Sequence, residues 1–299
     1  MTVPEPRFSD YLAEINAALG DALTRFGAAE NRSRGSDAVL EVMRYAIENG
    51  GKRIRPILTL AFCELCGGDA LSALPFACAA ETIHSYSLIH DDLPCMDDDD
   101  MRRGKPAVHI QFGEDMAVLA GDALLTLAFE LLLDADAPPE RLVSAGKVLA
   151  NAAGFCGMIA GQAMDMQNEG ETVDLATLEM TDARKTGALI GAACELGCIA
   201  AGAADTYRSA ALAFAKDLGL AFQIQDDILD VTADSATLGK PAGSDWMQDK
   251  STYVSLLGLS DSRTQVQALT VRAKQALAVF GQDSAFLCAL ADALCSRAN

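Results

Sequence analysis

An acidic run that follows an apolar segment is the feature that most constrains this chain. Residues 84–103 read HSYSLIHDDLPCMDDDDMRR. Carboxylates packed this closely repel one another, so the run is either a solvated loop or a cage for hard cations, which take oxygen ligands. The run alone fits both interpretations. Its carboxylates belong to Asp91, Asp92, Asp97, Asp98, Asp99 and Asp100.

A second acidic run, DDILD, begins at Asp226 and shifts the balance toward metal binding. Asp226 and Asp230 are four residues apart, so both lie on one face of a helix. Asp91 and Asp97 cannot share a face of an unbroken helix, but Pro94 opposes helix and lets the chain fold back. Two such clusters facing each other would hold several Mg²⁺ ions around a phosphate-bearing substrate. The candidate metal ligands are Asp91, Asp92, Asp97, Asp226, Asp227 and Asp230.

Helical periodicity extends over nearly the whole chain and predicts an all-α fold, because no alternating β-branched segment is found. The chain has 299 residues, 51% of them hydrophobic, and no break in composition. We therefore expect one domain over residues 1–299. After a polar N-terminal loop, helices are predicted from a cap at Ser36 to Gly50, from Pro56 to Gly67, from about Ser72 to the acidic run, and at about 114–134, 139–168, 174–185, 187–203, 205–232, 260–280 and 282–297.

The net charge of −19 argues against a nucleic-acid partner, since a polyanion requires a basic surface. The N-terminus lacks the basic and apolar regions of a secretory signal, and no apolar run is expected to reach the roughly 20 residues that span a bilayer. These observations predict a cytoplasmic protein. The nine scattered cysteines suit reduced core thiols, and the single CxxC at Cys63 and Cys66 is weak support for zinc.

Basic residues are scarce, 23 against 42 acidic ones, and they gather at the ends of predicted helices. Such placement predicts anion sites, although ordinary surface charge remains an alternative for each residue. The long segment 233–250, which directly follows the second acidic run, is typical of a functional lid. The basic residues in question are Lys52, Arg53, Arg55, Arg102, Arg103, Lys185, Lys240 and Lys250.

In this order, the motifs GGKRIRP, DDLPCMDDDDMRRGKP, GQAMD, KTG, FQIQDDILD and LGKPAG resemble the trans-isoprenyl diphosphate synthase family. Within that family they are most similar to the bacterial-type farnesyl diphosphate synthases. The resemblance covers essentially the whole chain, and two aspartate motifs plus the basic set make it specific. It implies an isoprenoid synthase fold, a helical bundle whose central cavity has both aspartate motifs at its mouth, and a homodimer.

The resemblance also implies site residues. Three Mg²⁺ ions would bridge Asp91, Asp97 and Asp226 to an allylic diphosphate, either dimethylallyl or geranyl diphosphate. Isopentenyl diphosphate would be held by Lys52, Arg55, His84 and Arg103. The allylic diphosphate would be held by Arg102, Lys185, Thr186, Gln223, Lys240 and Lys250. In the segment DKSTYV, Asp249 and Val254 depart from the family pattern, which leaves the local loop shape open.

The implied reaction is ionisation, condensation and elimination, giving (2E,6E)-farnesyl diphosphate. Breaking the allylic C–O bond separates a diphosphate anion from a carbocation, so metals and basic groups must stabilise the leaving group. The sequence offers no obvious base, and the resemblance suggests that the departed diphosphate takes the proton. A lid would exclude the water that traps the cation. The expected catalytic residues are Asp91, Asp97, Asp226, Lys185 and Arg102.

Product length depends on the cavity floor. Tyr86 lies five residues before Asp91, about a turn and a half below the expected metals, and Ser87 beside it is small. In the family an aromatic residue there limits growth to fifteen carbons. Geranyl or geranylgeranyl diphosphate synthases remain alternatives within the enzyme class. A terpene cyclase, a non-catalytic subunit of a synthase heteromer and a calcium-binding acidic protein fit the motifs less well.

Overall fold

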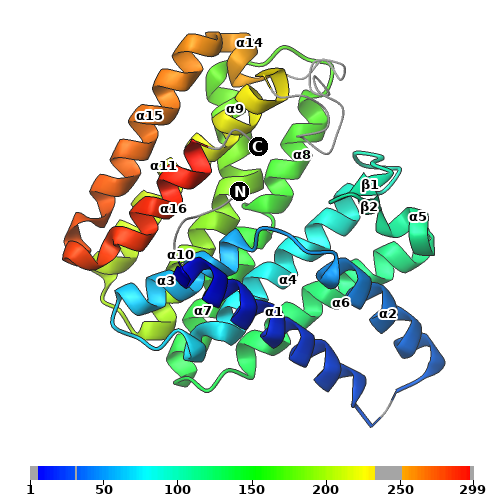
Figure 1. The fold of residues 1–299 in the computed structure, drawn as a ribbon. Coiled ribbons are helices and arrows are strands. Elements are labelled where there is room, and N and C mark those ends of the chain that lie inside the picture. Colours follow the sequence, from blue (N-terminus) through cyan, green and yellow to red (C-terminus); the bar gives the residue numbers. More distant parts are fainter. Residues whose placement is uncertain (1–5, 31, 233–250, 297–299) are drawn as a thin grey trace.

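The computed structural model describes residues 6–30, 32–232 and 251–296. In the described part the fold is all-α, a bundle of helices with one very short hairpin (Figure 1). The elements are α1 (Pro6–Gly27), α2 (Arg34–Glu48), α3 (Ile54–Leu65), η1 (Leu71–Ala73), α4 (Leu74–Asp91), β1 (Met101–Arg102), β2 (Lys105–Pro106), α5 (Val108–Phe112), α6 (Glu114–Leu133), α7 (Pro139–Ala153), α8 (Met158–Asn168), α9 (Leu175–Asp182), η2 (Ala183–Gly187), α10 (Ala188–Ala201), α11 (Asp205–Thr232), α14 (Tyr253–Leu257), α15 (Leu259–Ala276), η3 (Leu277–Ser284) and α16 (Ala285–Cys295).

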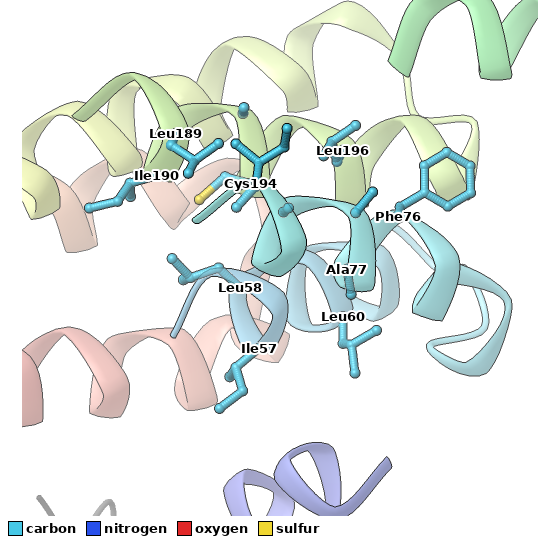
Figure 2. Packing of buried hydrophobic residues seen from close by; sticks show 14 of the residues in the cluster. Ile57, Leu58, Leu60, Phe76, Ala77, Leu189, Ile190, Cys194 and Leu196 are labelled. Atoms are coloured by element: carbon cyan, nitrogen blue, oxygen red, sulfur yellow. The ribbon is translucent and has the colours of Figure 1, made fainter. Parts of the chain in front are cut away.

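Part of the core lies where α3, α4 and α10 pack against one another (Figure 2). Eight consecutive residues of α3, from Pro56 to Cys63, are buried, as expected for a helix that is surrounded on all sides. A Cβ added to Gly197 of α10 would lie 2.2 Å from the carbonyl oxygen of Thr59, so the two backbones are in contact. The Thr59 hydroxyl also donates to the carbonyl oxygen of Ala193 at 2.9 Å. These contacts fix α3 relative to α10.

Helix α1 is absent from the sequence prediction, which treated this region as a polar loop. Its buried side chains include Tyr11, Ile15, Leu19 and Leu23, which recur every four residues and form one apolar face. The four-residue spacing was visible in the sequence. The first predicted cap also differs, because Ser33 caps α2 and Ser36 occupies the third helical position of a capping box.

The predicted helix at 139–168 is two helices, α7 and α8. The break falls at Gly154 and Gly157, where the backbone leaves the helical region. A Cβ at Gly157 would lie 2.1 Å from the carbonyl oxygen of Ala152, so this tight connection requires glycine. The two-residue strands β1 and β2 were not predicted either. They pair only Met101 with Pro106 and Arg102 with Lys105, so they form a tight turn and leave the all-α class unchanged.

By length and composition alone, α6 and the stretch Pro139–Asn168 are apolar enough to cross a membrane. We expected no apolar run of this length from the sequence, and these two stretches reach it by a criterion that tolerates charged residues. Buried core helices satisfy the same criteria, which makes the observation weak support for a span. Helix α6 packs along α4 over much of its length and buries Leu124, Leu127 and Leu131 there and against neighbouring helices. Its apolar composition follows from that position.

Candidate active site

The first acidic run folds back on itself at the end of α4. The helix ends at Asp91, and the backbone N–H of Asp97 donates to the Asp91 carbonyl oxygen at 2.8 Å. This is the reversal that Pro94 was expected to permit. Atom Oδ1 of Asp97 is buried and makes no hydrogen bond within the described chain. The two carboxylates thus lie close together with part of their hydrogen-bonding capacity unused.

The carboxylates of the first acidic run differ in how closely basic side chains approach them. Burial raises the pKa of Asp91 to about 6, and the neighbouring Asp97 and Asp92 add to the rise, while Lys185 and Arg102 oppose it. Asp92 is 1% exposed and accepts a hydrogen bond from Arg102, whose guanidinium also lies 3.0 Å from Asp99. Arg102 therefore pairs with Asp92 and Asp99 and offsets one of their two charges, so the first run as a whole keeps an excess of negative charge.

The second acidic run lies on α11, which continues unbroken to Thr232. Asp230 is 4% exposed. The Asp227 carboxylate accepts the backbone N–H of Tyr253, the first residue of α14, at 2.7 Å. One turn earlier, Gln223 lies near Asp182 and lowers the pKa of its carboxyl. The second run is thereby tied to the end of α9 and to the start of α14.

The donor set of both runs suits Mg²⁺, which takes one or two carboxylates and fills its remaining positions with water and phosphate oxygens. Within the described residues, no three His, Cys, Asp or Glu side chains form a preassembled ligand group. A zinc site at Cys63 and Cys66 gains no support. The unpaired Oδ1 of Asp97 and the raised pKa of Asp91 fit a divalent cation that arrives with a phosphate ligand.

A pocket of about 270 Å³, which we call the basic pocket, gathers the residues expected to bind isopentenyl diphosphate. Phe222 of α11, next to Gln223, lines it as well. Burial lowers the pKa of Arg55 to about 10, and the buried Nε of this guanidinium has no hydrogen-bond partner. The four expected residues on its wall are Lys52, Arg55, His84 and Arg103.

Arg53 also lines the basic pocket, but its side chain has a structural role. Its backbone is left-handed, with φ at 49°, and its guanidinium lies 2.6 Å from Glu81. Both side chains are 2% exposed, so each neutralises the other inside the core. Gly51 has a φ of 127°, which residues with a side chain rarely adopt, and a Cβ there would also lie 2.5 Å from the Arg103 guanidinium carbon. Arg103 donates to the carbonyl oxygen of Gly50, which holds it over the GGK turn.

A second cavity of about 480 Å³, which we call the apolar pocket, shares Arg55 and His84 with the basic pocket. Burial lowers the pKa of His84 well below its usual value, and the guanidiniums of Arg55 and Arg103 act in the same direction. The shared histidine is therefore neutral. The apolar pocket is also lined by Asp91 and by Tyr86, Ser87, Leu125, Met158, Lys185 and Thr186.

Tyr86 is 6% exposed, stacks edge-on against His90, and carries a buried hydroxyl without a hydrogen-bond partner. The Ser87 hydroxyl instead donates to the carbonyl oxygen of His84 at 2.9 Å. Lys185 pairs with Asp165, Nζ to Oδ2, at 2.6 Å. Sequence reasoning assigned no role to Asp165, although the GQAMD motif was recognised. Lys240, Lys250 and the expected lid at 233–250 lie outside the described residues.

The polyprenyl synthetase family matches residues 36–280, and the chain belongs to this family of prenyltransferases. It is 48% identical to the farnesyl diphosphate synthase of Escherichia coli over 268 residues, covering 87% of this chain and 89% of that protein. It is 49% identical to the large subunit 1 of a heterodimeric geranylgeranyl pyrophosphate synthase of Arabidopsis thaliana over 267 residues, covering 87% and 72%. An FPP/GFPP synthase structure from Zymomonas mobilis superposes with a TM-score of 0.83 at 40% identity, covering 95% of each chain.

These similarities establish the isoprenoid synthase fold and the reaction class. Enzymes of the family join isopentenyl diphosphate to allylic diphosphates in isoprene biosynthesis and generally depend on Mg²⁺. The relatives differ in product, since farnesyl and geranylgeranyl synthases are similarly close.

Proposed function

We propose that this chain is a farnesyl diphosphate synthase that extends dimethylallyl and geranyl diphosphate with isopentenyl diphosphate. The observation that carries the proposal is the pair of adjoining pockets that share Arg55 and His84. Several basic side chains line the basic pocket. The apolar pocket combines carboxylates, a lysine and hydrophobic side chains. A head-to-tail condensation requires two diphosphates side by side, with a dry space for the growing chain.

In the basic pocket, Lys52, Arg55 and Arg103 bind the diphosphate of isopentenyl diphosphate, and neutral His84 contributes a hydrogen bond. Guanidiniums suit this task because they bind phosphate oxygens in pairs without a metal. The unpaired Nε of Arg55 is available for such a bond. We infer that the double bond of isopentenyl diphosphate then faces the wall shared with the apolar pocket.

In the apolar pocket, Asp91, Asp97 and Asp226 hold Mg²⁺, three ions being expected, with Asp92, Asp227 and Asp230 beside them. The ions supply charge stabilisation to the departing diphosphate. Lys185 and Arg102 bind the same diphosphate, together with Thr186, Gln223, Lys240 and Lys250. Met158, Leu125 and Tyr86 keep water away from the allylic cation. The departed diphosphate accepts the proton that is lost at the end.

Tyr86 is proposed to close the apolar pocket at fifteen carbons. Its ring lies on the pocket wall five residues before Asp91, and its buried position leaves it little freedom to move aside. Geranylgeranyl diphosphate is the second candidate product, favoured by the 49% identity to a geranylgeranyl synthase subunit and by the small Ser87 on the same wall.

The test is incubation of the pure protein with Mg²⁺, isopentenyl diphosphate and either dimethylallyl or geranyl diphosphate, followed by chromatography of the dephosphorylated products. Farnesol as the main product supports the proposal. Geranylgeraniol as the main product would select the second candidate, and an absence of every elongated product would remove prenyl elongation as the function.

We also propose that the protein is a cytoplasmic homodimer. Helices α5 to α8 and their connections present several large apolar side chains to solvent, and such side chains gathered in one region are typical of a partner surface. Sedimentation at micromolar concentration would show a dimer, and Phe155→Lys should weaken it. The exposed side chains are Ile110, Val118, Leu119, Leu133, Phe155 and Ile159.

A further inference from the structure

The GQAMD motif packs directly against the turn that carries Lys185. Its first residue, Gly161, lies on α8, and a Cβ there would be 2.1 Å from the backbone nitrogen of Lys185. Lys185 itself sits in a π-helical turn, Ala183–Gly187. Only glycine permits this approach, so the backbone of Lys185 is fixed against α8.

Asp165 is four residues beyond Gly161 and therefore lies on the same face of α8, one turn further along. Its Oδ2 is 2.6 Å from the Lys185 ammonium, and the two side chains are 25% and 26% exposed. Burial alone would lower the pKa of Lys185, but Asp165 raises it, and Asp91 and Asp97 act in the same direction. The lysine therefore lies among three carboxylates but is in direct contact with Asp165.

We propose that Asp165 is a positioning residue that keeps the Lys185 ammonium off the carboxylates of the first acidic run. The inference rests on the proposed function of that run as a metal site. A lysine side chain is long and flexible, and without Asp165 the attraction of two close carboxylates would draw the ammonium onto Asp91 or Asp97. It would then occupy the place of a metal ion. With Asp165 present, Lys185 stays beside the pocket and can turn to a diphosphate when one binds.

The experiment compares Asp165→Asn, Asp165→Glu, Lys185→Ala and the double variant Asp165→Asn/Lys185→Ala. We expect Asp165→Asn to lower kcat about 10- to 100-fold and to weaken binding of Mg²⁺-pyrophosphate, measured by calorimetry, about tenfold, with the KM for isopentenyl diphosphate unchanged. Asp165→Glu should restore part of the loss. The double variant should be no worse than Lys185→Ala alone, because Asp165 acts through the lysine.

Asp292→Asn is the matched control, since Asp292 forms a similar 2.7 Å ion pair with Lys274 on the surface. Its kinetics should equal those of the wild type. Unchanged pyrophosphate binding in Asp165→Asn, or losses that multiply in the double variant, would overturn the inference. If the wild type lacks turnover, the proposed function fails, whereas the calorimetric comparison still decides the role of Asp165.

A separate observation concerns two thiols between α3 and α10. Cys66 follows the last turn of α3, and its Sγ is 3.7 Å from the Sγ of Cys198 on α10. The two helices are in backbone contact at Gly197, the residue before Cys198. Cys66 is partly exposed, whereas Cys198 is fully buried. The Cys66 thiol donates to the Cys198 sulfur, and Cys66 is the one of the two that solvent reaches.

We infer that Cys66 and Cys198 form a disulfide when the protein meets hydrogen peroxide. The Cys66 thiolate attacks the peroxide, an S–O bond forms as the O–O bond breaks, and one water leaves after protonation. The Cys198 sulfur then attacks the Cys66 sulfenic acid, the S–O bond breaks, and the second water leaves. Two thiols are oxidised, one peroxide is reduced to two waters, and α3 becomes covalently joined to α10.

The test is mild peroxide treatment followed by digestion and mass spectrometry without reductant. We expect a linked pair of peptides containing Cys66 and Cys198, lighter by two hydrogen atoms than the separate peptides, and a higher unfolding temperature that Cys66→Ser abolishes. Cys95 and Cys156, both exposed, are internal comparators. Oxidation of those two thiols with Cys66 and Cys198 still reduced, or a sulfinic acid at Cys66, would overturn the inference.

Discussion

The basic pocket and the apolar pocket are both proposed to hold a diphosphate, yet they are built from opposite charges. The first places guanidiniums around the anion and keeps His84 neutral. The second presents Asp91, with Asp97 near it, and these carboxylates repel an anion unless a cation lies between them. This difference fits the proposed reaction, in which isopentenyl diphosphate keeps its diphosphate and the allylic substrate loses it. The loss of the diphosphate requires the stronger charge stabilisation.

Removing the metal ligands should have the largest effect and tests the apolar pocket directly. Asp91→Ala and Asp226→Ala should each lower kcat by about 10³-fold or more, because the departing diphosphate loses its main stabilisation. EDTA should abolish turnover of the wild type, and excess Mg²⁺ should restore it. Full activity in either variant would remove that residue from the metal site.

Arg103→Ala should show whether the two pockets bind different substrates. It should raise the KM for isopentenyl diphosphate about 10- to 100-fold, because a charge-assisted hydrogen bond to this substrate is lost. The KM for geranyl diphosphate should stay nearly unchanged. Arg272→Ala, which removes a guanidinium paired with Asp217 on the surface, is the control. Equal changes in both KM values would show that the pockets do not discriminate between the substrates.

Tyr86→Ala should lengthen the product with a smaller effect on rate. Removing the ring opens the wall of the apolar pocket, so chains beyond fifteen carbons can be accommodated. Chromatography of the dephosphorylated products measures the shift, with Tyr86→Phe as the matched control, since it keeps the ring and removes only the unpaired hydroxyl. An unchanged profile in Tyr86→Ala would place the floor elsewhere.

The smallest expected effect concerns stability. Burial raises the pKa of Asp182 to about 6, with Asp165 adding to the rise. Because the folded protein binds this proton more tightly than the unfolded chain, the stabilising contribution is complete below pH about 4 and is lost as the pH rises through about 6. Relative to Asp182→Asn, the wild type should lose about 1 to 3 kcal/mol over that range. Urea unfolding of both proteins at several pH values measures the difference, and parallel curves would contradict it.

Much of the fold was predictable because apolar residues recur at helical spacing along the long helices. The prediction was wrong where glycines acted locally, as at Gly154 and Gly157, since the same residue type is tolerated inside α10. It also missed α1, where many polar residues obscured a regular apolar face. The π-helical turn at Ala183–Gly187 has no composition signal, because its residues differ from those of an ordinary helix only in how they are hydrogen-bonded.

The candidate site was predictable where a residue type in a given pattern suggests a single role. The acidic runs stood out, and the reversal at Pro94 followed from its chemistry. The basic residues were harder, since Lys52, Arg53 and Arg55 look alike in sequence. Only the buried partner Glu81 shows that Arg53 stabilises the fold. Asp165 was missed because a single acid on a helix gives no signal until its partner, 20 residues away, is placed beside it.

Arg102 and Arg103 are adjacent in the chain, yet the left-handed backbone of Arg103, with φ at 55°, sends their side chains to different partners. Arg102 lies against Asp92 and Asp99, and Arg103 donates to the Gly50 carbonyl oxygen over the GGK turn. The guanidiniums proposed to hold the two diphosphates are therefore only one peptide unit apart in the chain.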